Sequence, residues 1–552
     1  MPKAELSETR KGRGAFFTPP EISQFMTEWA LRSSQDVVLE PSCGEAAFLL
    51  PAAKRLRSLG ALELSMPEQL HGLDIHRDSV AEAGRLLACQ GFNVRLEVED
   101  FFERSAQPAY DAVVGNPPYI RYQNFSGAPR LAALEAALRQ GVRLNRLASS
   151  WAAFTVHASA FLKCDGRLAL VLPAELLAVK YAAEIRRFLL RRFAHVRLVL
   201  FETLVFPGVL EEVVLLLAEG SGGAERFEVY QARDAEELRD ASAARWFGFT
   251  PREDESWTGA LLPSQAYALY DETLAGQNFE TLSDWGQTYL GAVTGNNNYF
   301  CLRRSQVDEL GLADDELVRI SPPGSKHLRG LALSEADWME LVQADERCFL
   351  FAPGSRPSRA AQRYIAEGES KGVHEAYKCQ VREPWWQVPL VRRPDLVFTY
   401  MNHDRPRLLR NAAGVQLLNS LYGVRLHGEH RELGDELLAV ASLNSVTSLG
   451  AEVVGRSYGG GMLKHEPTEA DRLPLPSREA LASIAPQLLG LRPQIDSLLA
   501  RNEVSAAAER IDGLILRECM GMSDIKVAAI RIARDALQQR RMNRARGQRG
   551  KN

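Results

Sequence analysis

The run Asp111-Ala-Val-Val-Gly-Asn-Pro-Pro-Tyr119 joins a strand to a short, stiff loop. Its apolar residues from Ala112 to Val114 predict a buried strand. The side-chain oxygen of Asn116 and the carbonyl of Pro117 are acceptors that a single exocyclic amine can satisfy together. Two consecutive prolines stiffen the loop, and Tyr119 offers a ring on which a planar base can stack. The stretch therefore predicts a site for a nucleobase amine or, less often, for a side-chain amide.

Short apolar strands alternate with amphipathic helical stretches on both sides of this loop, from Asp36 to about Glu219. Such alternation is typical of a parallel, doubly wound α/β sheet. Ligands of these sheets bind beyond the carboxyl ends of the strands. Strands are expected near 36–40, 71–75, 93–98, 112–115, 167–172 and 211–218, with helices up to residue 59 and at 79–90 and 151–162.

Three successive predicted strands each end in an acidic residue. These positions are Glu40, Asp74 with Ile75, and Asp100 with Phe101. The first carboxylate can reach a cationic ligand terminus across the small-residue turn that ends at Gly44, where glycine permits close approach of the backbone. The second can hold two ribose hydroxyls beside an apolar cover for adenine, and the third offers an acceptor for an amine and a ring wall. One such acid is usually a helix cap or turn residue, but three in succession predict a pocket for a nucleoside-like cofactor.

Composition sets the broad class of the protein. The 552 residues predict two or three domains, and 46% hydrophobic with 25% charged residues is typical of a globular chain. A net charge of −4 gives no argument for nucleic-acid binding, which must come from local patches. The seven cysteines are scattered, so we expect reduced thiols and no metal site.

Several classes of protein are disfavoured by what the sequence lacks. Gly-x-Gly-x-x-Gly and Gly-x-x-x-x-Gly-Lys are both absent, which leaves dinucleotide and P-loop sites without support. The first thirteen residues are polar and charged, unlike a signal peptide. No apolar run reaches the roughly 20 residues of a membrane span. We therefore expect a cytoplasmic protein without membrane contact.

The motifs together resemble those of the γ-class, Taq-type DNA adenine N6-methyltransferases of bacterial restriction-modification systems. Within the first 220 residues the resemblance rests on Gly14–Glu21, Leu39–Gly44, Asn116–Tyr119, Trp151–Phe154, Arg167–Pro173 and Phe206-Pro207. Further on it rests on Gly291–Phe300, Leu443–Ser445 and Gly459–Pro476. One departure is Glu45-Ala-Ala47, where the family often has a second glycine.

This resemblance implies a fold, a reaction and partners. The fold would be α/β, a doubly wound Rossmann-like methyltransferase sheet followed by a C-terminal mixed α+β target-recognition domain. We expect a catalytic domain at 1–245, a connection at 246–284, target recognition at 285–476 and a helical segment with a basic tail at 477–552. The reaction would transfer a methyl group from S-adenosyl-L-methionine to adenine N6 of a flipped base in double-stranded DNA. A cognate restriction endonuclease would be a separate chain.

The family's functional residues carry over to matching positions. Its cofactor contacts would be Thr18, Glu40, Asp74, Ile75, Asp100, Phe101 and Phe154. Its base contacts would be Asn116, Pro117, Tyr119 and Phe206. Core packing is the alternative for Phe154 and Phe206, and an N-cap before Pro19 is the alternative for Thr18.

Other functions remain open on the residues. A protein glutamine methyltransferase can use the same acceptors, although the motif at Thr18 and the long region after the sheet argue against it. A catalytically inactive DNA-binding module is disfavoured by the intact loop at Asn116. A methyltransferase fused to a nuclease lacks a second catalytic constellation beyond residue 290. Cytosine N4 poses the same chemistry as adenine N6.

DNA contacts are harder to assign. Basic residues between 371 and 410 are interleaved with Trp385, Trp386 and Tyr400, and they predict either a groove-reading surface or an ordinary ion-paired one. They are Lys371, Lys378, Arg382, Arg392, Arg393, Arg405, Arg407 and Arg410. Asn296 to Asn298 are either loop formers or minor-groove donors. The tail from Arg531 carries eight Lys or Arg against Asp535, and it is either a solvated terminus or a phosphate contact.

Overall fold

The computed structural model describes residues 18–206, 212–240, 246–251, 256–458 and 461–549, with the backbone alone for 543–549. The motif at Gly14–Phe17, the residues Pro207, Gly459 and Gly460, and the side chains of the last ten residues lie outside this part. The chain forms two compact units, which divide between Ser264 and Gln265, and Asn543–Asn552 is grouped with the first unit. The expected four-part domain division remains a prediction.

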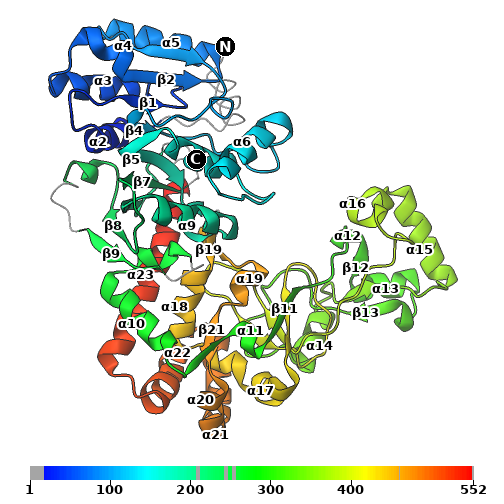
Figure 1. Ribbon diagram of the computed structural model, residues 1–552. Coiled ribbons are helices and arrows are strands. Elements are labelled where there is room, and N and C mark those ends of the chain that lie inside the picture. Colours follow the sequence, from blue (N-terminus) through cyan, green and yellow to red (C-terminus); the bar gives the residue numbers. More distant parts are fainter. Residues whose placement is uncertain (1–17, 207–211, 241–245, 252–255, 459–460, 550–552) are drawn as a thin grey trace. The chain divides into compact units, whose positions relative to one another are not determined.

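The first unit is built on a nine-stranded sheet with the order β3-β2-β1-β4-β5-β7-β6-β8-β9 (Figure 1). Its strands are β1 (Val38–Glu40), β2 (Leu70–Asp74), β3 (Arg95–Val98), β4 (Tyr110–Gly115), β5 (Leu162–Pro173), β6 (His195–Phe201), β7 (Val213–Glu219), β8 (Phe227–Ala232) and β9 (Phe247–Phe249). The strands β3, β2, β1, β4 and β5 are parallel to one another, with Leu39 opposite both His71 and Val113. The doubly wound α/β class is thereby confirmed.

The expectation of a parallel sheet up to about Glu219 is wrong at β7, and β9, which lies beyond that range, is antiparallel as well. β7 runs antiparallel between β5 and β6, and β9 runs antiparallel to β8. Only residues 202–212 join β6 to β7. A parallel return needs a crossover of about a dozen residues or more, usually with a helix, whereas a short connection reverses the chain direction. The apolar pattern of β7 indicates a buried strand and carries no information about its direction.

Helices cover both faces of this sheet. α2 (Pro20–Ala30) packs against α3 (Leu49–Ser58), β4 and β5, while α7 (Ser150–Ser159) packs against α6 (Gly127–Arg139), α9 (Ala183–Arg192) and β5. α5 (Arg77–Cys89) packs against β2 and β3. Consecutive residues of β5 and β7 are buried, which requires cover on both faces. The exposed edge left for a ligand is therefore at the strand ends.

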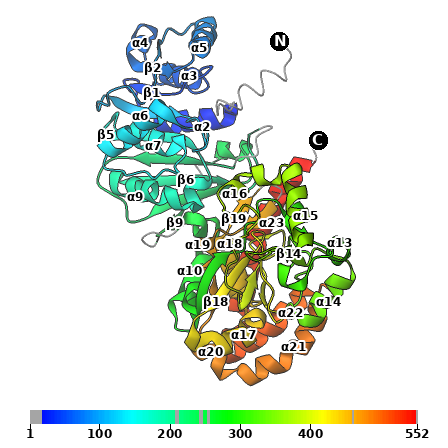
Figure 2. The same cartoon turned by 90° about the vertical axis from the view of Figure 1, so that its right-hand side faces the viewer.

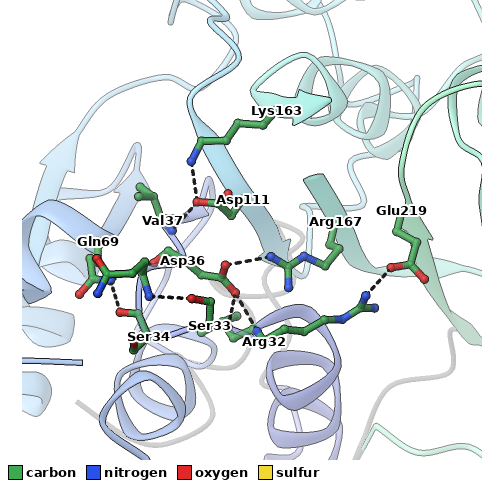
Figure 3. A network of polar contacts seen from close by, with 12 residues as sticks. Arg32, Ser33, Ser34, Asp36, Val37, Gln69, Asp111, Lys163, Arg167 and Glu219 are labelled. Atoms are coloured by element: carbon green, nitrogen blue, oxygen red, sulfur yellow. Dashed lines mark hydrogen bonds and ion pairs between the residues drawn. The ribbon is translucent and has the colours of Figure 1, made fainter. Parts of the chain in front are cut away.

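A polar network ties together the amino-terminal side of the sheet (Figure 3). The Asp36 carboxylate accepts hydrogen bonds from the backbone N–H groups of Arg32 and Ser33 at 2.7 and 3.1 Å. It also forms an ion pair with Arg167 at 3.0 Å, and both side chains are at most 9% exposed. Asp111 accepts from the Val37 N–H at 2.9 Å. This network fixes the starts of β1 and β4, which places their far ends in register at the ligand side.

The second unit contains one four-stranded, two three-stranded and one two-stranded sheet within the described residues. In sheet order they are β11 (Gly286–Leu290), β18 (Tyr422–Leu426), β15 (Leu396–Phe398) and β17 (Leu408–Arg410); β12 (Cys301–Leu302), β14 (Phe349–Phe351) and β13 (Leu317–Arg319); β16 (Met401–Asn402), β20 (Met462–Lys464) and β19 (Arg456–Tyr458); β10 (Phe279–Thr281) and β21 (Pro474–Pro476). Helices surround these sheets, so this unit has the expected mixed α+β character.

Helices dominate the end of the second unit, as the sequence predicts. They include α17 (Arg431–Ala441), α18 (Ser445–Val454), α20 (Arg478–Ser483), α21 (Ala485–Ala500), α22 (Val504–Asp512) and, as far as Met542, α23 (Asp524–Arg549). α17 packs against α20 and α21 (Figure 2). In the described part of the chain no single helix has the length and apolarity to cross a membrane; one pair bent by 88°, Gly428–Ala441 with Ser445–Val454, passes on length and composition alone.

Ion pairs hold α23 in place. Arg541 pairs with Glu452 of α18 at 2.7 Å, and both side chains are buried. Arg531 pairs with Asp512 at 2.6 Å, and Asp512 also accepts from the Ser445 hydroxyl at 2.5 Å. These two arginines of the basic tail are therefore structural, which contradicts a solvated terminus at their positions.

Candidate active site

The predicted catalytic loop follows β4 directly. Asn116 comes immediately after Gly115, the last residue of that strand. Glu40 and Asp74 are the last residues of β1 and β2, and Asp100 lies two residues beyond β3. Because these four strands are parallel and adjacent, their carboxyl ends lie along one edge of the sheet. The structure thus brings together the residues that the strand-end argument selected.

Asn116 is held from outside its own loop. Its Nδ2 donates to the Thr18 hydroxyl oxygen at 3.2 Å, and Thr18 is 3% exposed. Its Oδ1 is buried and accepts no hydrogen bond from the described residues. A buried acceptor without a partner costs free energy unless a ligand supplies the donor. Thr18 also lies just before the N-cap of α2, so it connects the amino-terminal motif to the loop.

The main-chain carbonyls of the loop differ in their partners. The Ser42 hydroxyl donates to the Asn116 carbonyl at 3.2 Å, and the Ser150 hydroxyl donates to the Pro118 carbonyl. Within the described chain no donor to the Pro117 carbonyl is present. Tyr119 donates its hydroxyl to the Val171 carbonyl at 2.9 Å, which fixes the ring against the sheet.

The turn after β1 and the end of β2 form the cofactor side of the site. One Asp74 oxygen accepts from the Gly44 N–H at 3.0 Å, and the other accepts from the His76 N–H at 2.8 Å. A carboxylate has about four acceptor positions, so two remain for ribose hydroxyls. Gly44 has φ +49°, and a Cβ built there would meet no atom within 4 Å. Ile75 is 58% exposed beside Asp74, as a cover for an adenine ring requires.

The family's missing glycine has a clear counterpart in this turn. Ala46 stands in the left-handed region with φ 65°, although it carries a side chain. Alanine pays roughly 1–2 kcal/mol in this conformation, and glycine avoids that cost. The turn therefore keeps the shape that a glycine favours, and its buried methyl group packs into the core.

Glu40 is turned toward the protein interior. Its side chain is 1% exposed, and one carboxylate oxygen accepts from the Leu49 N–H at the start of α3 at 2.8 Å. Burial raises the pKa of the Glu40 carboxyl well above its ordinary value of 4.5, against the hydrogen bonds from the backbone of Leu49 and Phe48, and the charge of Asp74 raises it further. Glu40 therefore caps α3, and its contact with a cofactor stays a prediction.

A pH-dependent gain in stability is expected for Glu40→Gln. The unfolded carboxyl loses its proton near pH 4.5, while the folded one keeps it to higher pH. The wild type therefore loses stability as pH rises above about 4.5, whereas glutamine does not titrate. Thermal midpoints at pH of about 5 and about 8 should show a widening gap in favour of the variant. A gap independent of pH would contradict this. Glu45→Gln, at an exposed position in the same turn, serves as the control.

Aromatic rings build the wall after β3. Phe101 lies 4.7 Å from Phe154 and 4.6 Å from His157 between ring centroids. His157 bonds the Phe101 carbonyl through Nε2 at 3.0 Å, and burial lowers the pKa of His157, which favours a neutral ring. Asp100 accepts from the Phe102 N–H at 3.0 Å, which shapes the turn that carries Phe101. Phe101 and Phe154 thus form one aromatic wall, and the contact of either ring with a cofactor stays a prediction.

Phe206 lies apart from the loop's hydrogen bonds. It is 4% exposed and belongs to the hydrophobic core cluster of the first unit, against which Tyr119 also packs. Core packing is what the structure shows for this ring. Its role as a second stacking partner for a base remains a prediction.

Several of the suspected DNA-binding residues of the second unit have partners within that unit. Arg407 pairs with Asp404 at 2.9 Å, and Arg410 pairs with Asp435 and Glu436 at 2.8 and 2.6 Å. Further contacts join Lys371 to Glu367, Arg382 to the Val293 and Thr294 carbonyls, Trp385 to Glu369, and the Tyr400 ring to Tyr422. Arg392 and Arg393 are exposed. The ion-paired alternative therefore holds for Lys371, Arg407 and Arg410.

The Asn296–Asn298 run forms a loop. Asn296 caps α12 (Asn297–Phe300) by accepting from the N–H groups of Asn298 and Tyr299 at 3.1 and 3.2 Å. Thr294 donates to Asn297, and Arg347 donates to Asn298. All three side chains have partners inside the unit, which supports the loop-forming alternative.

Sequence reasoning missed three residues of the site, Ser42, Ser150 and His157. Ser42 lies in the turn for which only Gly44 indicated a close approach to a ligand. Ser150 is the first residue of α7, just before Trp151. A serine before a helix is an ordinary N-cap signal and does not point to a second loop. His157 follows Phe154 by three positions on one helix, which places both on the same face. That spacing was the one available signal.

Two family models of known proteins match consecutive parts of this chain. "N-6 DNA Methylase" matches residues 4–232, and the C-terminal domain of "Type II methyltransferase M.Eco57I" matches residues 254–516. Type II methyltransferase M.AccI of Acinetobacter calcoaceticus is 22% identical over 84% of this chain and 85% of its own. Type II methyltransferase M.XamI of Xanthomonas campestris pv. amaranthicola is 25% identical over 85% of this chain and 86% of its own.

A solved structure also shows this fold. The Type IIL restriction-modification enzyme MmeI, determined in complex with DNA, superposes with a TM-score of 0.55 over 94% of this chain and 75% of that one, at 11% identity. The sheet order, the loop after β4 and the consecutive matches to both family models agree with one another. The amino-terminal part of the chain thus matches the N-6 DNA Methylase family, and the carboxy-terminal part matches the C-terminal domain of Type II methyltransferase M.Eco57I.

Proposed function

We propose that this chain methylates the N6 amine of adenine in double-stranded DNA, as the modification enzyme of a restriction-modification system. The observation that carries the proposal is the pair of acceptors without partners among the described residues, Asn116 Oδ1 and the Pro117 carbonyl. An exocyclic amine has two N–H groups, one for each acceptor.

The loop would act through its fixed oxygens. Conjugation with the ring makes an adenine amine a poor nucleophile. Two acceptors on its N–H groups stabilise the positive charge that develops on nitrogen during attack, and they aim its lone pair. A neutral Asn116 suffices because the proton can leave after the transfer. An amine within a duplex is out of reach, so the base would be flipped out and stacked on Tyr119, with Phe206 as a second ring.

The strand-end residues fit S-adenosyl-L-methionine. That cofactor supplies an electrophilic methyl group carried on sulfur. Asp74 would hold the ribose, and Asp100 would accept from the adenine amine. Ile75 and the Phe101–Phe154 wall would cover the faces of the adenine ring. The open side of Gly44 leaves room for the methionine part of the cofactor. Glu40 and Thr18 would complete the methionine side, as in the family.

A transfer assay with separate substrates tests this function. The purified chain receives radiolabelled S-adenosylmethionine with genomic duplex DNA or with a mixture of proteins. We expect label in DNA alone, and N6-methyladenine in its nucleoside digest. Label in protein glutamine, or N4-methylcytosine in the digest, would contradict the proposal, as would a failure to bind the cofactor by calorimetry. Modified-base sequencing of the product then gives the target sequence.

A further inference from the structure

Two serine hydroxyls reach the catalytic loop from different elements. Ser42 lies in the turn after β1 and donates to the Asn116 carbonyl at 3.2 Å. Ser150 begins α7 and donates to the Pro118 carbonyl. The two serines thus take alternate carbonyls, on either side of Pro117.

The loop cannot satisfy these carbonyls by itself. Prolines 117 and 118 have no N–H group, so the loop lacks the donors of an ordinary turn. Buried carbonyls need partners, and an unpaired one costs roughly as much as a lost hydrogen bond. External hydroxyls therefore meet this need at Asn116 and Pro118 and leave Pro117, a buried residue, without a donor among the described residues.

Ser150 makes three hydrogen bonds to the loop. Besides its bond to Pro118, its hydroxyl accepts from the Ile120 N–H at 2.9 Å, and its own N–H donates to the Ile120 carbonyl at 3.0 Å. Ser150 is buried, so water does not replace these contacts. The segment 118–120, with Tyr119 at its centre, is fastened to the first turn of α7.

We propose that Ser42 and Ser150 are positioning residues, which restrict the loop's free acceptors to Asn116 Oδ1 and the Pro117 carbonyl and hold these two in line for the target amine. The inference rests on the proposed function. It assigns to the two serines no contact with substrate. Their effect on the reaction passes through the loop and is measured separately from any contribution of their hydrogen bonds to stability.

Ser150→Ala is the principal test, with Ser159→Ala as its matched control. Ser159 is a buried serine at the other end of α7, and its hydroxyl donates to the Val156 carbonyl of the same helix. Misplacing one acceptor should lower kcat of Ser150→Ala about tenfold. Ser159→Ala should keep the kcat of the wild type with a similar shift in melting temperature. Ser42→Ala should lower kcat about threefold, since one bond is lost.

A thermodynamic cycle separates positioning from general damage. Duplexes with the sequence identified by modified-base sequencing carry either adenine or purine, which lacks the amine, at the target position. The wild type should bind the adenine duplex more tightly than the purine duplex, and Ser150→Ala should lose most of that difference in affinity. A general structural defect would weaken the binding of both duplexes equally and leave the ratio of their dissociation constants unchanged. Ser150→Cys, whose thiol is a weak donor, should fall between the two and serves as the second variant if alanine impairs folding.

The outcomes are distinct. A kcat of Ser150→Ala equal to that of Ser159→Ala, or an unchanged preference for the adenine duplex, overturns the inference. The proposed function fails instead if Asn116→Ala keeps its activity or if DNA is not methylated at all. An inactive Asn116→Ala with a fully active Ser150→Ala would sink the positioning role alone.

Discussion

Asn116→Ala should lower methyl transfer to DNA by about a hundred- to a thousandfold, the cost of removing one preorganised polar group at a reacting centre. The change removes the buried Oδ1 acceptor and the hydrogen bond to Thr18. S-adenosylmethionine binding should stay close to that of the wild type, because the strand-end carboxylates are untouched. Single-turnover transfer and calorimetry measure the two quantities separately.

Asn124→Ala is the matched control. Asn124 is exposed, eight positions further along the chain, and its backbone N–H bonds the Arg121 carbonyl. It should transfer methyl groups at the rate of the wild type. Near-normal turnover by Asn116→Ala would instead remove the central role given to the loop, and a parallel loss of cofactor binding would indicate collapse of the site.

Asp36→Ala should destabilise the first unit by about 3–5 kcal/mol, because it leaves Arg167 as an uncompensated buried charge. The same carboxylate accepts from the N–H groups of Arg32 and Ser33, which also lose their partner. Amide exchange of β1 and β5 should speed up accordingly. Mass-spectrometric hydrogen exchange in the native state reports these strands separately from the second unit.

Two further variants check the cause. Glu135→Ala breaks the exposed pair of Glu135 with Arg139, which are 67% and 60% exposed, and should cost only about 0.3–0.5 kcal/mol. Asp36→Leu combined with Arg167→Met removes both buried charges and should recover part of the loss. If Asp36→Ala cost no more than Glu135→Ala, the buried ion pair would not be a main support of the sheet.

Local patterns made part of the site predictable. Asn116, Asp74 and Asp100 each follow an apolar run within one or two residues, and parallel strands bring such positions to one edge. Phe154 was identified only through family resemblance, and its neighbour His157 was not identified at all. The contact of His157 with Phe101 joins residues 56 positions apart and depends on how α7 packs on the sheet.

Contacts between distant segments explain most of what was missed. Ser42 and Asn116 are 74 positions apart and meet only because β1 and β4 pair. The ion pairs of Arg410 were hidden for the same reason, since its partners lie on α17, about 25 positions away. A charge count does not reveal which arginines are already neutralised. The direction of β7 was likewise hidden, because a fully buried strand has the same apolar pattern in either orientation.

The alanine at position 46 has a consequence for ligand affinity. A turn with glycine there would sample many shapes and would lose that freedom on closing around a cofactor. A methyl group in the left-handed region, packed into the core, removes most of those shapes beforehand. The turn then loses its conformational entropy during folding, so a ligand that binds to it would lose less binding free energy to the ordering of the turn. The turn thus carries a small backbone strain in the folded state, and a cofactor that binds there would meet a turn whose shape is already fixed.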